Sequence, residues 1–457
     1  MPPGLSLPQG GGAIRGLGES FQPSAFSGTV AFSVPLHTTP GRGPVPTLTL
    51  AYNSAAGNGP YGLGFTVDVP LIGRQTRLRV PRYDDTDTFF FSAAGDLVPA
   101  LRLEDGAWVP DARTVTEDGV EWTVRAYAPR VEAGAGRVER WTRADTGDVH
   151  WRVVSAENTV TVFGRGEAAR IADPGDPLRV FRWLPEESVD PRGSRVLYAW
   201  KPEDGANLPD TLAEAGHDWR GQRYLHSLAY GNYLPAGGGA EAFAFEAVFD
   251  YGEYELSGLD RPGADPYRPF RPWPVRADPF SSYRAGFELR TLRLCRGVLM
   301  FHRFAELGPE PCLVRATRFG HEQTPTFSFL DAVWQAGYRR GDDGAYAEQA
   351  LPPLTFGYSR FAPPTAPRFE PLLVPRAADL PGYLGAGAFF PVDLDGEGLP
   401  GFLYSDGPTT LYYAPLGGGA YAAPESPDAF PGVGTLPADG VTVRDLDANG
   451  RLELVVE

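Results

Sequence analysis

Apolar residues recur at every second position in several stretches of the chain, and this alternation limits the possible folds more than any other feature. It is clearest over residues 30–36, 48–52, 120–124, 149–153 and 243–251. Because successive side chains of a β-strand point to opposite faces, each stretch predicts a strand with one apolar, covered face. The sequence therefore predicts a mostly β protein built of antiparallel sheets.

Helical signals are scarce, whereas turn signals are frequent. No long stretch has apolar residues about 3.6 positions apart, and only residues 210–215 are expected to form a single helical turn. The 56 glycines and 46 prolines are spread between the short apolar stretches, where they favour turns. Both observations support an all-β fold.

The length of the chain predicts more than one domain. A single hydrophobic core seldom serves more than about 250–300 residues, and this chain has 457. A proline-rich connector over residues 361–382 marks a boundary. We expect a β-rich domain over residues 1–360 and a different region over residues 383–457.

The charge of the chain limits its partners. It has 41 basic and 57 acidic residues, a formal net charge of −16, and an acidic surface repels phosphate backbones and anionic lipids. We therefore expect no nucleic-acid partner. No apolar run reaches the roughly 18 residues of a membrane-spanning helix, so no direct membrane insertion is expected.

The amino-terminal residues and the cysteines bear on where the protein is made and matures. Residues 1–12 lack the basic start and apolar core of a signal peptide, so we expect synthesis in the bacterial cytoplasm without a recognisable signal. Cys295 and Cys312 are the only cysteines. We expect two buried thiols, because zinc needs more ligands than these and a framework of disulfides needs more cysteines.

Two similar acidic loops distinguish the carboxy-terminal region. One begins at Asp393 and the other, 52 residues later, at Asp445, and an apolar strand follows each. Repetition at this period with strands between is typical of the blades of a β-propeller. We therefore expect residues 383–457 to be an incomplete β-propeller region, and the natural chain to continue past Glu457.

The acidic loops are candidates for calcium sites. Calcium takes about six to eight oxygen ligands from carboxylates, amide carbonyls and backbone. The candidate ligands are Asp445, Asp447, Asn449 and Glu453 in the second loop and Asp393, Asp395 and Glu397 in the first. Gly401 occupies the position where the first loop would need its last carboxylate, so that loop lacks one calcium ligand. The alternative for both is a metal-free turn in which an Asp side chain accepts hydrogen bonds from backbone N–H groups.

Several long blocks of sequence, in fixed order, resemble one family. The blocks cover residues 5–19, 33–42, 50–65, 81–87, 171–174, 278–288, 293–302 and 351–358. Together they resemble the SpvB-type family (Salmonella virulence plasmid B protein), whose domain is shared by the B components of insecticidal Tc toxin complexes. The resemblance covers roughly residues 1–360, and the tail is similar to the FG-GAP/VCBS propeller repeats that follow in toxin B components.

The resemblance implies a structural role. In Tc toxins the B component and a C component form a hollow shell around a toxic payload, and the propeller docks on the pore-forming A component. The resemblance thus implies a shell-type β domain, partners among the toxin-complex components, and release to the extracellular region. It implies no catalytic residues in this domain.

A few motifs suggest other chemistry and are better explained without it. Glu253 and Glu255 resemble the Glu-x-Glu pair of ADP-ribosyltransferases, a domain that SpvB itself carries. That chemistry also needs an upstream Arg strand and a Ser-Thr-Ser strand, and here Ser281-Ser282 comes after the pair. We expect a solvated strand end at this pair and no enzyme activity. The six histidines, at no metal-ligand spacing, are expected to be surface or packing residues.

Two alternative functions stay open from the sequence. The chain could be the N-terminal delivery domain of an ADP-ribosyltransferase toxin, or a calcium-dependent binding and adhesion module. The propeller-like tail favours a toxin-complex B component over the first alternative, and the amino-terminal blocks disfavour the second. The sequence downstream of residue 457 would discriminate among them.

Overall fold

The computed structural model describes most of the chain, as two compact units. The described residues are 18–23, 29–131, 136–235, 238–359, 372–373, 389–406, 408–427, 441–446 and 452–456. The first unit is Met1–Tyr358 and the second is Ser359–Glu457. The expected connector at residues 361–382 lies outside the described residues except at Leu372 and Leu373. Each unit is described by itself below.

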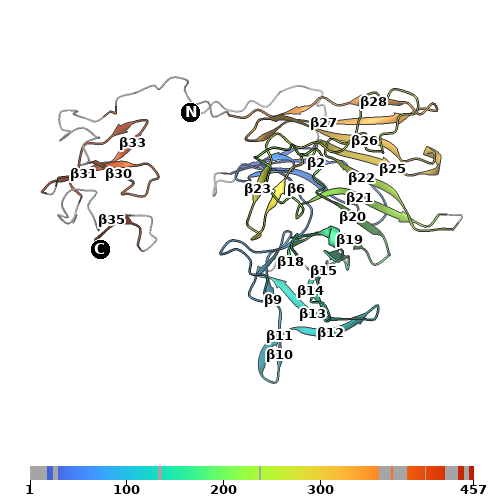
Figure 1. Ribbon diagram of the computed structural model, residues 1–457, viewed down its shortest axis with the longest axis horizontal. Coiled ribbons are helices and arrows are strands. Elements are labelled where there is room, and N and C mark those ends of the chain that lie inside the picture. The colour runs from blue at the N-terminus through green and yellow to red at the C-terminus, as the bar shows by residue number, and fades with distance from the viewer. Residues whose placement is uncertain are drawn as a thin grey trace. The chain divides into compact units, whose positions relative to one another are not determined.

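Most strands of the first unit form one continuous antiparallel ladder, visible as the stacked arrows of Figure 1. In order of pairing, its strands are β17 (Arg170–Asp173), β18 (Asp176–Trp183), β7 (Ile72–Arg74), β8 (Phe89–Phe91), β9 (Gly95–Pro99), β13 (Val120–Pro129), β14 (Arg137–Arg143), β15 (Val149–Val154), β16 (Val160–Phe163), β19 (Pro185–Val189), β20 (Arg195–Pro202), β21 (Arg223–Tyr233), β22 (Ala242–Asp250), β25 (Gly297–His302), β26 (Cys312–Gln323), β27 (Ser328–Arg340) and β28 (Tyr346–Ala350). Two further strands, β12 (Ala112–Glu117) and β29 (Leu354–Thr355), pair with β13 and β27.

A smaller sheet covers one face of this ladder. It has the order β1 (Ser20–Pro23), β2 (Val30–Leu36), β3 (Leu48–Asn53) and β6 (Phe65–Val67). Val34 and Leu50 of the small sheet are fully buried, and they belong to one apolar core with Leu228, Tyr230 and other residues of the ladder. The alternation over residues 30–36 and 48–52 therefore predicts correctly which side chains face the core.

Two strands are covered on both faces, whereas the sequence predicts a covered face on one side only. In β22, Phe249 packs into the core with the small sheet, while Val248 belongs to a second apolar cluster on the opposite side. In β15, His150 is buried although its position in the alternation predicts exposure, because its ring packs against Trp122 and Trp141, with centroids 4.7 and 5.6 Å away. Layers on both sides of these strands, which the local pattern does not reveal, cover the second face.

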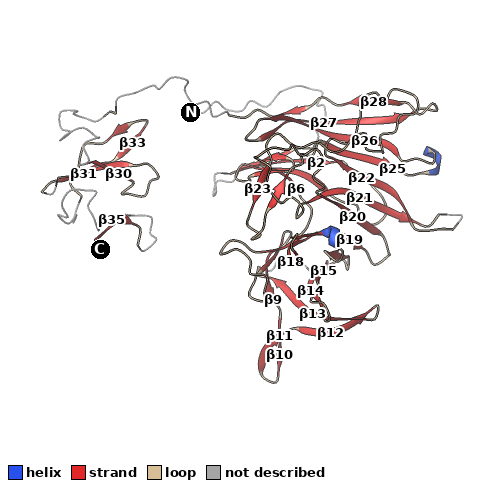
Figure 2. Ribbon diagram, in the orientation of Figure 1, coloured by secondary structure: helices blue, strands red, loops and turns tan. Residues whose placement is uncertain are grey.

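Helix is nearly absent from the described residues, as Figure 2 shows. They contain two short 3-10 helices, η1 (Glu167–Ala169) and η2 (Ala305–Leu307). At residues 210–215 the chain makes a turn in which Ala215 N donates to Thr211 O at 3.0 Å, but no helix continues from it. No helix among the described residues is long and apolar enough to cross a membrane. The prediction of a mostly β, antiparallel fold is confirmed.

Short hairpins complete the first unit. They are β4 (Asn58–Gly59) with β5 (Gly62–Leu63), β10 (Leu101–Glu104) with β11 (Ala107–Pro110), and β23 (Phe280–Ser282) with β24 (Leu289–Thr291). The hairpin β4–β5 is the link between the small sheet and the loops around Arg276, whose guanidinium donates to Gly59 O at 2.8 Å.

The second unit consists of small antiparallel sheets. They are β30 (Phe389–Val392), β31 (Gly401–Ser405) and β32 (Thr410–Tyr413) in one sheet, β33 (Pro415–Gly417) with β34 (Ala420–Tyr421), and β35 (Val441–Arg444) with β36 (Glu453–Val456). Val392, Leu403 and Tyr412 form one buried cluster, and Phe389, Tyr404 and Tyr413 form another. The described residues of this unit do not close into a propeller, so the propeller stays a prediction.

Glycines shape the family block at residues 50–65. Gly62 and Gly64 have φ angles of +101° and +80°, a region that favours residues without a Cβ. A Cβ on Gly64 would lie 2.4 Å from the Tyr52 ring. The backbone N–H of Gly64 donates to Gly57 O, and its carbonyl accepts from Asn53 N, both at 3.0 Å. The glycine thus lets the chain turn tightly against β3.

We expect Gly64→Ala to lower the free energy of unfolding by about 2–4 kcal/mol. A left-handed φ costs an L-residue roughly 1–2 kcal/mol, and the added methyl overlaps Tyr52, so further strain adds to it. Gly147→Ala, at a φ of +74° with nothing within 4 Å, should lower the free energy of unfolding only by the cost of the left-handed φ. Gly57→Ala, at an open position without a positive φ, should be nearly neutral. Chemical denaturation of the three variants measures this, and equal losses at positions 64 and 147 would contradict the steric part.

Candidate functional site

The first acidic loop connects β30 to β31 and is fully described. The Asp393 carboxylate accepts hydrogen bonds from the backbone N–H groups of Gly396, Glu397 and Gly398, at 3.0, 3.1 and 2.7 Å. This is the side-chain-to-backbone turn that was the alternative to a metal site. Asp395 and Glu397 are exposed. The pKa of Glu397 is raised, by desolvation first and then by the negative charges of Asp395 and Asp393.

The second acidic loop is described in part. Asp445 and Glu453 are described, whereas Asp447 and Asn449 lie outside the described residues. Strands β35 and β36 pair Arg444 with Glu453, which places Asp445 and Glu453 at the same end of the hairpin. The Glu453 carboxylate accepts a hydrogen bond from Leu446 N at 2.8 Å. Across the described part of the chain, no three His, Cys, Asp or Glu side chains are grouped to hold a metal, and calcium at these loops stays a prediction.

Glu253 and Glu255, the Glu-x-Glu pair, lie in different surroundings. Glu253 is buried, and its carboxylate accepts hydrogen bonds from Lys201 Nζ at 3.0 Å and Tyr251 N at 3.2 Å. Glu255 is exposed and accepts one from Ser257 N at 2.8 Å. The expectation of a solvated strand end is therefore correct for Glu255 and wrong for Glu253, because the single lysine of the chain reaches in from the end of β20 to neutralise the buried carboxylate.

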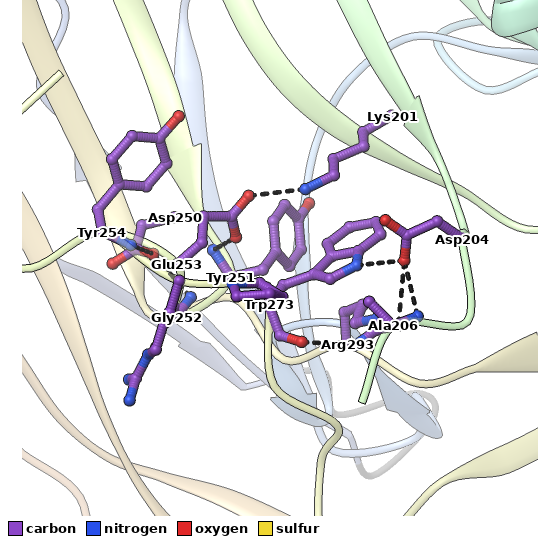
Figure 3. A network of polar contacts seen from close by, with 12 residues as sticks. Lys201, Asp204, Ala206, Asp250, Tyr251, Gly252, Glu253, Tyr254, Trp273 and Arg293 are labelled. Atoms are coloured by element: carbon purple, nitrogen blue, oxygen red, sulfur yellow. Dashed lines mark hydrogen bonds and ion pairs between the residues drawn. The ribbon is translucent and has the colours of Figure 1, made fainter. Parts of the chain in front are cut away.

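Figure 3 shows that Glu253 belongs to a network around Trp273. The Trp273 ring lies between two cations, with Lys201 Nζ 3.7 Å and Arg293 Cζ 4.4 Å from its centroid. Its indole Nε1 donates to Asp204 at 2.6 Å, and its carbonyl accepts from Arg293 at 2.9 Å. Burial alone would raise the pKa of Asp204, but hydrogen bonds from Ala206 N and the indole lower it.

A fully buried ion pair anchors this network. Arg293 donates through its guanidinium to the Glu203 carboxylate, and both side chains are completely covered. Removing one partner of such a pair typically costs about 3–5 kcal/mol, because the other charge stays buried. The network therefore holds the loops 203–222 and 251–279 to the ends of β20 and β22. Each carboxylate in it already has a cationic or N–H partner, which suits a structural joint better than acid–base catalysis.

The histidines have packing or hydrogen-bonding roles, although the alternation did not predict the burial of His150. His302 bonds Thr39 at 2.7 Å, His217 bonds Glu288 at 2.6 Å, and His321 bonds the Tyr61 carbonyl at 3.2 Å. Burial lowers the pKa of His150 and His321 to about 3. Cys295 and Cys312 are free, buried thiols, as expected.

A cavity that the sequence did not indicate lies within the first unit. It has a volume of about 590 Å³, and its walls come from segments as far apart as the hairpin β4–β5, strands β7 and β18, the start of β21 and the hairpin β23–β24. Because these segments are distant in sequence, no local spacing could bring them together. In the sequence, only arginines without an acidic residue close by in the chain point to such a cavity, and this feature alone is weak evidence.

Comparison with known proteins identifies the family. A family model described as "SpvB: Salmonella virulence plasmid 65kDa B protein" matches residues 24–304. The chain therefore belongs to the SpvB family, and the expected resemblance is confirmed. The Mono(ADP-ribosyl)transferase SpvB of Salmonella typhimurium is 35% identical over 346 residues, which are 73% of this chain and 56% of that protein. The chain thus spans about half the length of the curated relatives it matches.

Solved structures resemble different extents of the chain. The N-terminal domain of the effector protein SpvB from Salmonella typhimurium strain LT2 covers 67% of this chain and 98% of its own, with 35% identity and a TM-score of 0.61. A chain of TcdB2-TccC3 covers 99% of this chain and 22% of its own, with 33% identity and a TM-score of 0.80. A chain of the Tc holotoxin pore of Photorhabdus luminescens covers 99% of this chain and 21% of its own, with 32% identity and a TM-score of 0.81.

The buried carboxyl of Asp250 should make stability depend on pH. Burial raises its pKa from 3.8 to about 6, although Gly252 N and Tyr254 N donate to it at 2.6 and 3.3 Å. Since the folded pKa lies above the unfolded one, ionisation of Asp250 lowers stability as pH rises from about 4 to 6, by about 3 kcal/mol in total. Asp250→Asn keeps the accepting oxygen and cannot ionise.

We therefore expect Asp250→Asn to match the native protein below pH 4 and to be more stable by up to about 3 kcal/mol above pH 6. Denaturant unfolding at several pH values measures the difference. Asp260→Asn, which removes an exposed carboxylate from the neighbouring loop, is the matched control. A difference that is constant across pH would contradict the expectation.

Calcium binding at the second acidic loop has a direct test. Calcium should raise the unfolding temperature of the chain, with a stabilisation of about 2.7 kcal/mol at one hundred times the dissociation constant. Asp445→Asn should abolish this response, and Asp393→Asn should leave most of it. Magnesium at equal ionic strength is the control. A chain that does not respond to calcium would leave both loops as metal-free turns.

Proposed function

We propose that this chain is a non-catalytic structural part of a bacterial toxin complex. In this role it forms part of the wall of a shell that encloses a toxic payload. The main support is the similarity to a TcdB2-TccC3 chain, which covers 99% of this chain and so includes most of the second unit. The partners would be a C component that carries the payload and a pore-forming A component.

The first unit has physical properties that suit a wall. Its ladder pairs strands from β17 to β28 without interruption, so few backbone groups between them are free. Apolar clusters lie on both sides of β22, and buried ion pairs fix the long loops. Such a layered sheet resists local opening, which a container for another protein requires.

The second unit supports a docking role. Its small antiparallel sheets and its repeated acidic loops fit the opening part of a propeller of the FG-GAP/VCBS kind, which further strands would complete. We propose that this propeller docks on the pore-forming component. The similarity to a chain of the Tc holotoxin pore supports the assignment, and release to the extracellular region follows from the same role.

One alternative has an observation in its favour. The relatives at 35% identity are named mono(ADP-ribosyl)transferases, so the chain could be the N-terminal delivery domain of such a toxin. The match to those relatives covers 73% of the chain, whereas the match to TcdB2-TccC3 covers 99%. The greater coverage favours the toxin-complex component. In both cases we propose that this chain itself has no catalytic activity.

A chimera tests the proposed wall function. The segment of TcdB2 that matches this chain is replaced by residues 1–457, and the hybrid is produced with TccC3. We expect a closed shell of the native size in which the payload resists protease, because the matched surfaces and core are shared. A second chimera that exchanges residues 1–358 alone, and keeps the TcdB2 tail, tests the first unit separately.

The contrary outcome is a chimera that folds but leaves the payload open to protease. In that case the chain does not form part of the shell wall, and the result favours the alternative function as a delivery domain. Incubation of the unmodified chain with NAD gives an independent reading, for which we expect only background hydrolysis. Turnover that disappears in Glu255→Gln would show that the chain is an enzyme.

A further inference from the structure

The cavity of the first unit has an unusual charge for this chain. Among the described residues, five arginines line it, and no aspartate, glutamate or lysine does. They are Arg74, Arg77, Arg182, Arg223 and Arg284. The chain as a whole carries a net charge of −16, so a wall of this composition opposes the general trend. A positive cavity in an acidic protein attracts anions.

Two of these arginines already have acidic partners. Arg74 is buried and pairs with Asp87 at 2.8 Å, and its Nε donates to Val180 O at 2.9 Å. Arg77 pairs with Asp96 at the rim, where its own side chain is 69% exposed. Their charges are therefore largely compensated by the protein.

The other three arginines differ from these two in their partners. Within the described residues, Arg182, Arg223 and Arg284 form no ion pair, but Arg223 Nη1 donates to the carbonyls of Arg220 and Gln222 at 2.8 and 3.0 Å. The Nε atoms of Arg182 and Arg223 are buried and lack a hydrogen-bond partner in the described part of the chain. A buried donor without a partner typically costs about 1–3 kcal/mol, and more when it is charged. The guanidinium charges of these arginines thus have no carboxylate partner within the described residues.

Arg182 and Arg284 line the same cavity, and no acidic residue is among its described lining residues. Arg182 lies directly opposite Gly73 in the pairing of β18 with β7, where an added Cβ would lie 2.8 Å from the Phe90 ring and 3.4 Å from Arg182 Cγ. Arg284 lies in the turn of the hairpin β23–β24, which Tyr83 fastens by donating to Ala285 O. Burial lowers the pKa of Arg182, and the positive charge of Arg284 lowers it further. For Arg223, burial also lowers the pKa, and Glu167 offsets part of this effect.

The size and the remaining walls of the cavity define the ligand. Its volume of about 590 Å³ lies within the range of small-molecule sites, roughly 300–1,000 Å³, and greatly exceeds that of a bare inorganic ion. Phe181, Trp200 and Tyr61 supply apolar and aromatic surface beside the arginines. Guanidinium groups match the geometry of carboxylate and phosphate oxygens in a way that lysine does not.

We propose that this cavity binds a small organic anion through phosphate or carboxylate oxygens held by Arg182 and Arg284. The ligand compensates the positive charges of Arg182 and Arg284, which no carboxylate of the described residues neutralises. Its organic part lies against the aromatic walls. This site is independent of the proposed shell function, since it requires only the first unit.

Binding to the full chain tests this proposal. Isothermal titration and thermal unfolding are carried out with adenosine monophosphate, citrate and inorganic phosphate, against chloride at equal ionic strength. We expect saturable binding of at least one organic anion at or below about 1 mM, and a raised unfolding temperature. A response to adenosine monophosphate assigns phosphate chemistry to the site, and a response to citrate assigns carboxylate chemistry.

Variants locate the site and separate binding from folding. Arg284→Gln changes an exposed residue, so the fold should persist while the dissociation constant rises at least tenfold. Arg182→Met keeps the apolar stem. Without anion it should be as stable as the native protein or more so, because one uncompensated cation is gone, and with anion it should lose the added stability. Arg339→Gln, an exposed arginine of β27 outside the cavity, should change the dissociation constant less than twofold.

Three outcomes would overturn the proposal. The first is no saturable binding of any probe, which would mean that water alone fills the cavity or that an acidic polypeptide occupies it. The second is an equal effect of chloride, which would indicate screening by salt. The third is binding that survives both Arg284→Gln and Arg182→Met, which would place the anion elsewhere.

Discussion

Backbone hydrogen bonding between neighbouring strands is the constraint on which the first unit depends. Strands of three or four residues connect long parts of the ladder. β7 joins β18 to β8, and β16 joins β15 to β19. Because buried N–H and C=O groups need partners, the register of these short strands fixes the position of everything paired beyond them. The same register places Arg182 opposite Gly73, in the wall of the arginine cavity.

Buried ion pairs fix the positions of the loops, as backbone hydrogen bonds fix the positions of the strands. Arg293 with Glu203 and Arg276 with Asp278 are almost completely covered. Arg276 also donates to the carbonyl of Gly59, 217 residues away, and Arg293 to that of Trp273, 20 residues away. Such pairs add little net stability but are costly to break. They therefore hold long irregular segments in one conformation. The planar guanidinium with several donors suits this role, which agrees with a chain in which almost every cation is arginine.

The sequence predicts the strands well and the sites poorly, for a physical reason. Alternation is local, so the pattern of residues alone assigns Val34 and Leu50 to the core. Whether a second layer covers the opposite face is not local, and for this reason the pattern does not reveal the burial of His150 and Glu253. The Asp393 loop can be recognised as an acidic turn, because its bonds span at most five residues. The arginine cavity joins segments more than two hundred residues apart, which no spacing rule can anticipate.

Lys201 has a consequence for how this protein can be modified. It is the only lysine of the chain, its side chain is 30% exposed, and its ammonium is held by Glu253 and by the face of Trp273. Amine-directed chemistry, such as acylating labels, lysine cross-linkers or the ligation of ubiquitin, therefore has a single and largely shielded side-chain target on a surface rich in arginine. This chain therefore offers lysine-dependent modification or degradation almost no reactive side chain.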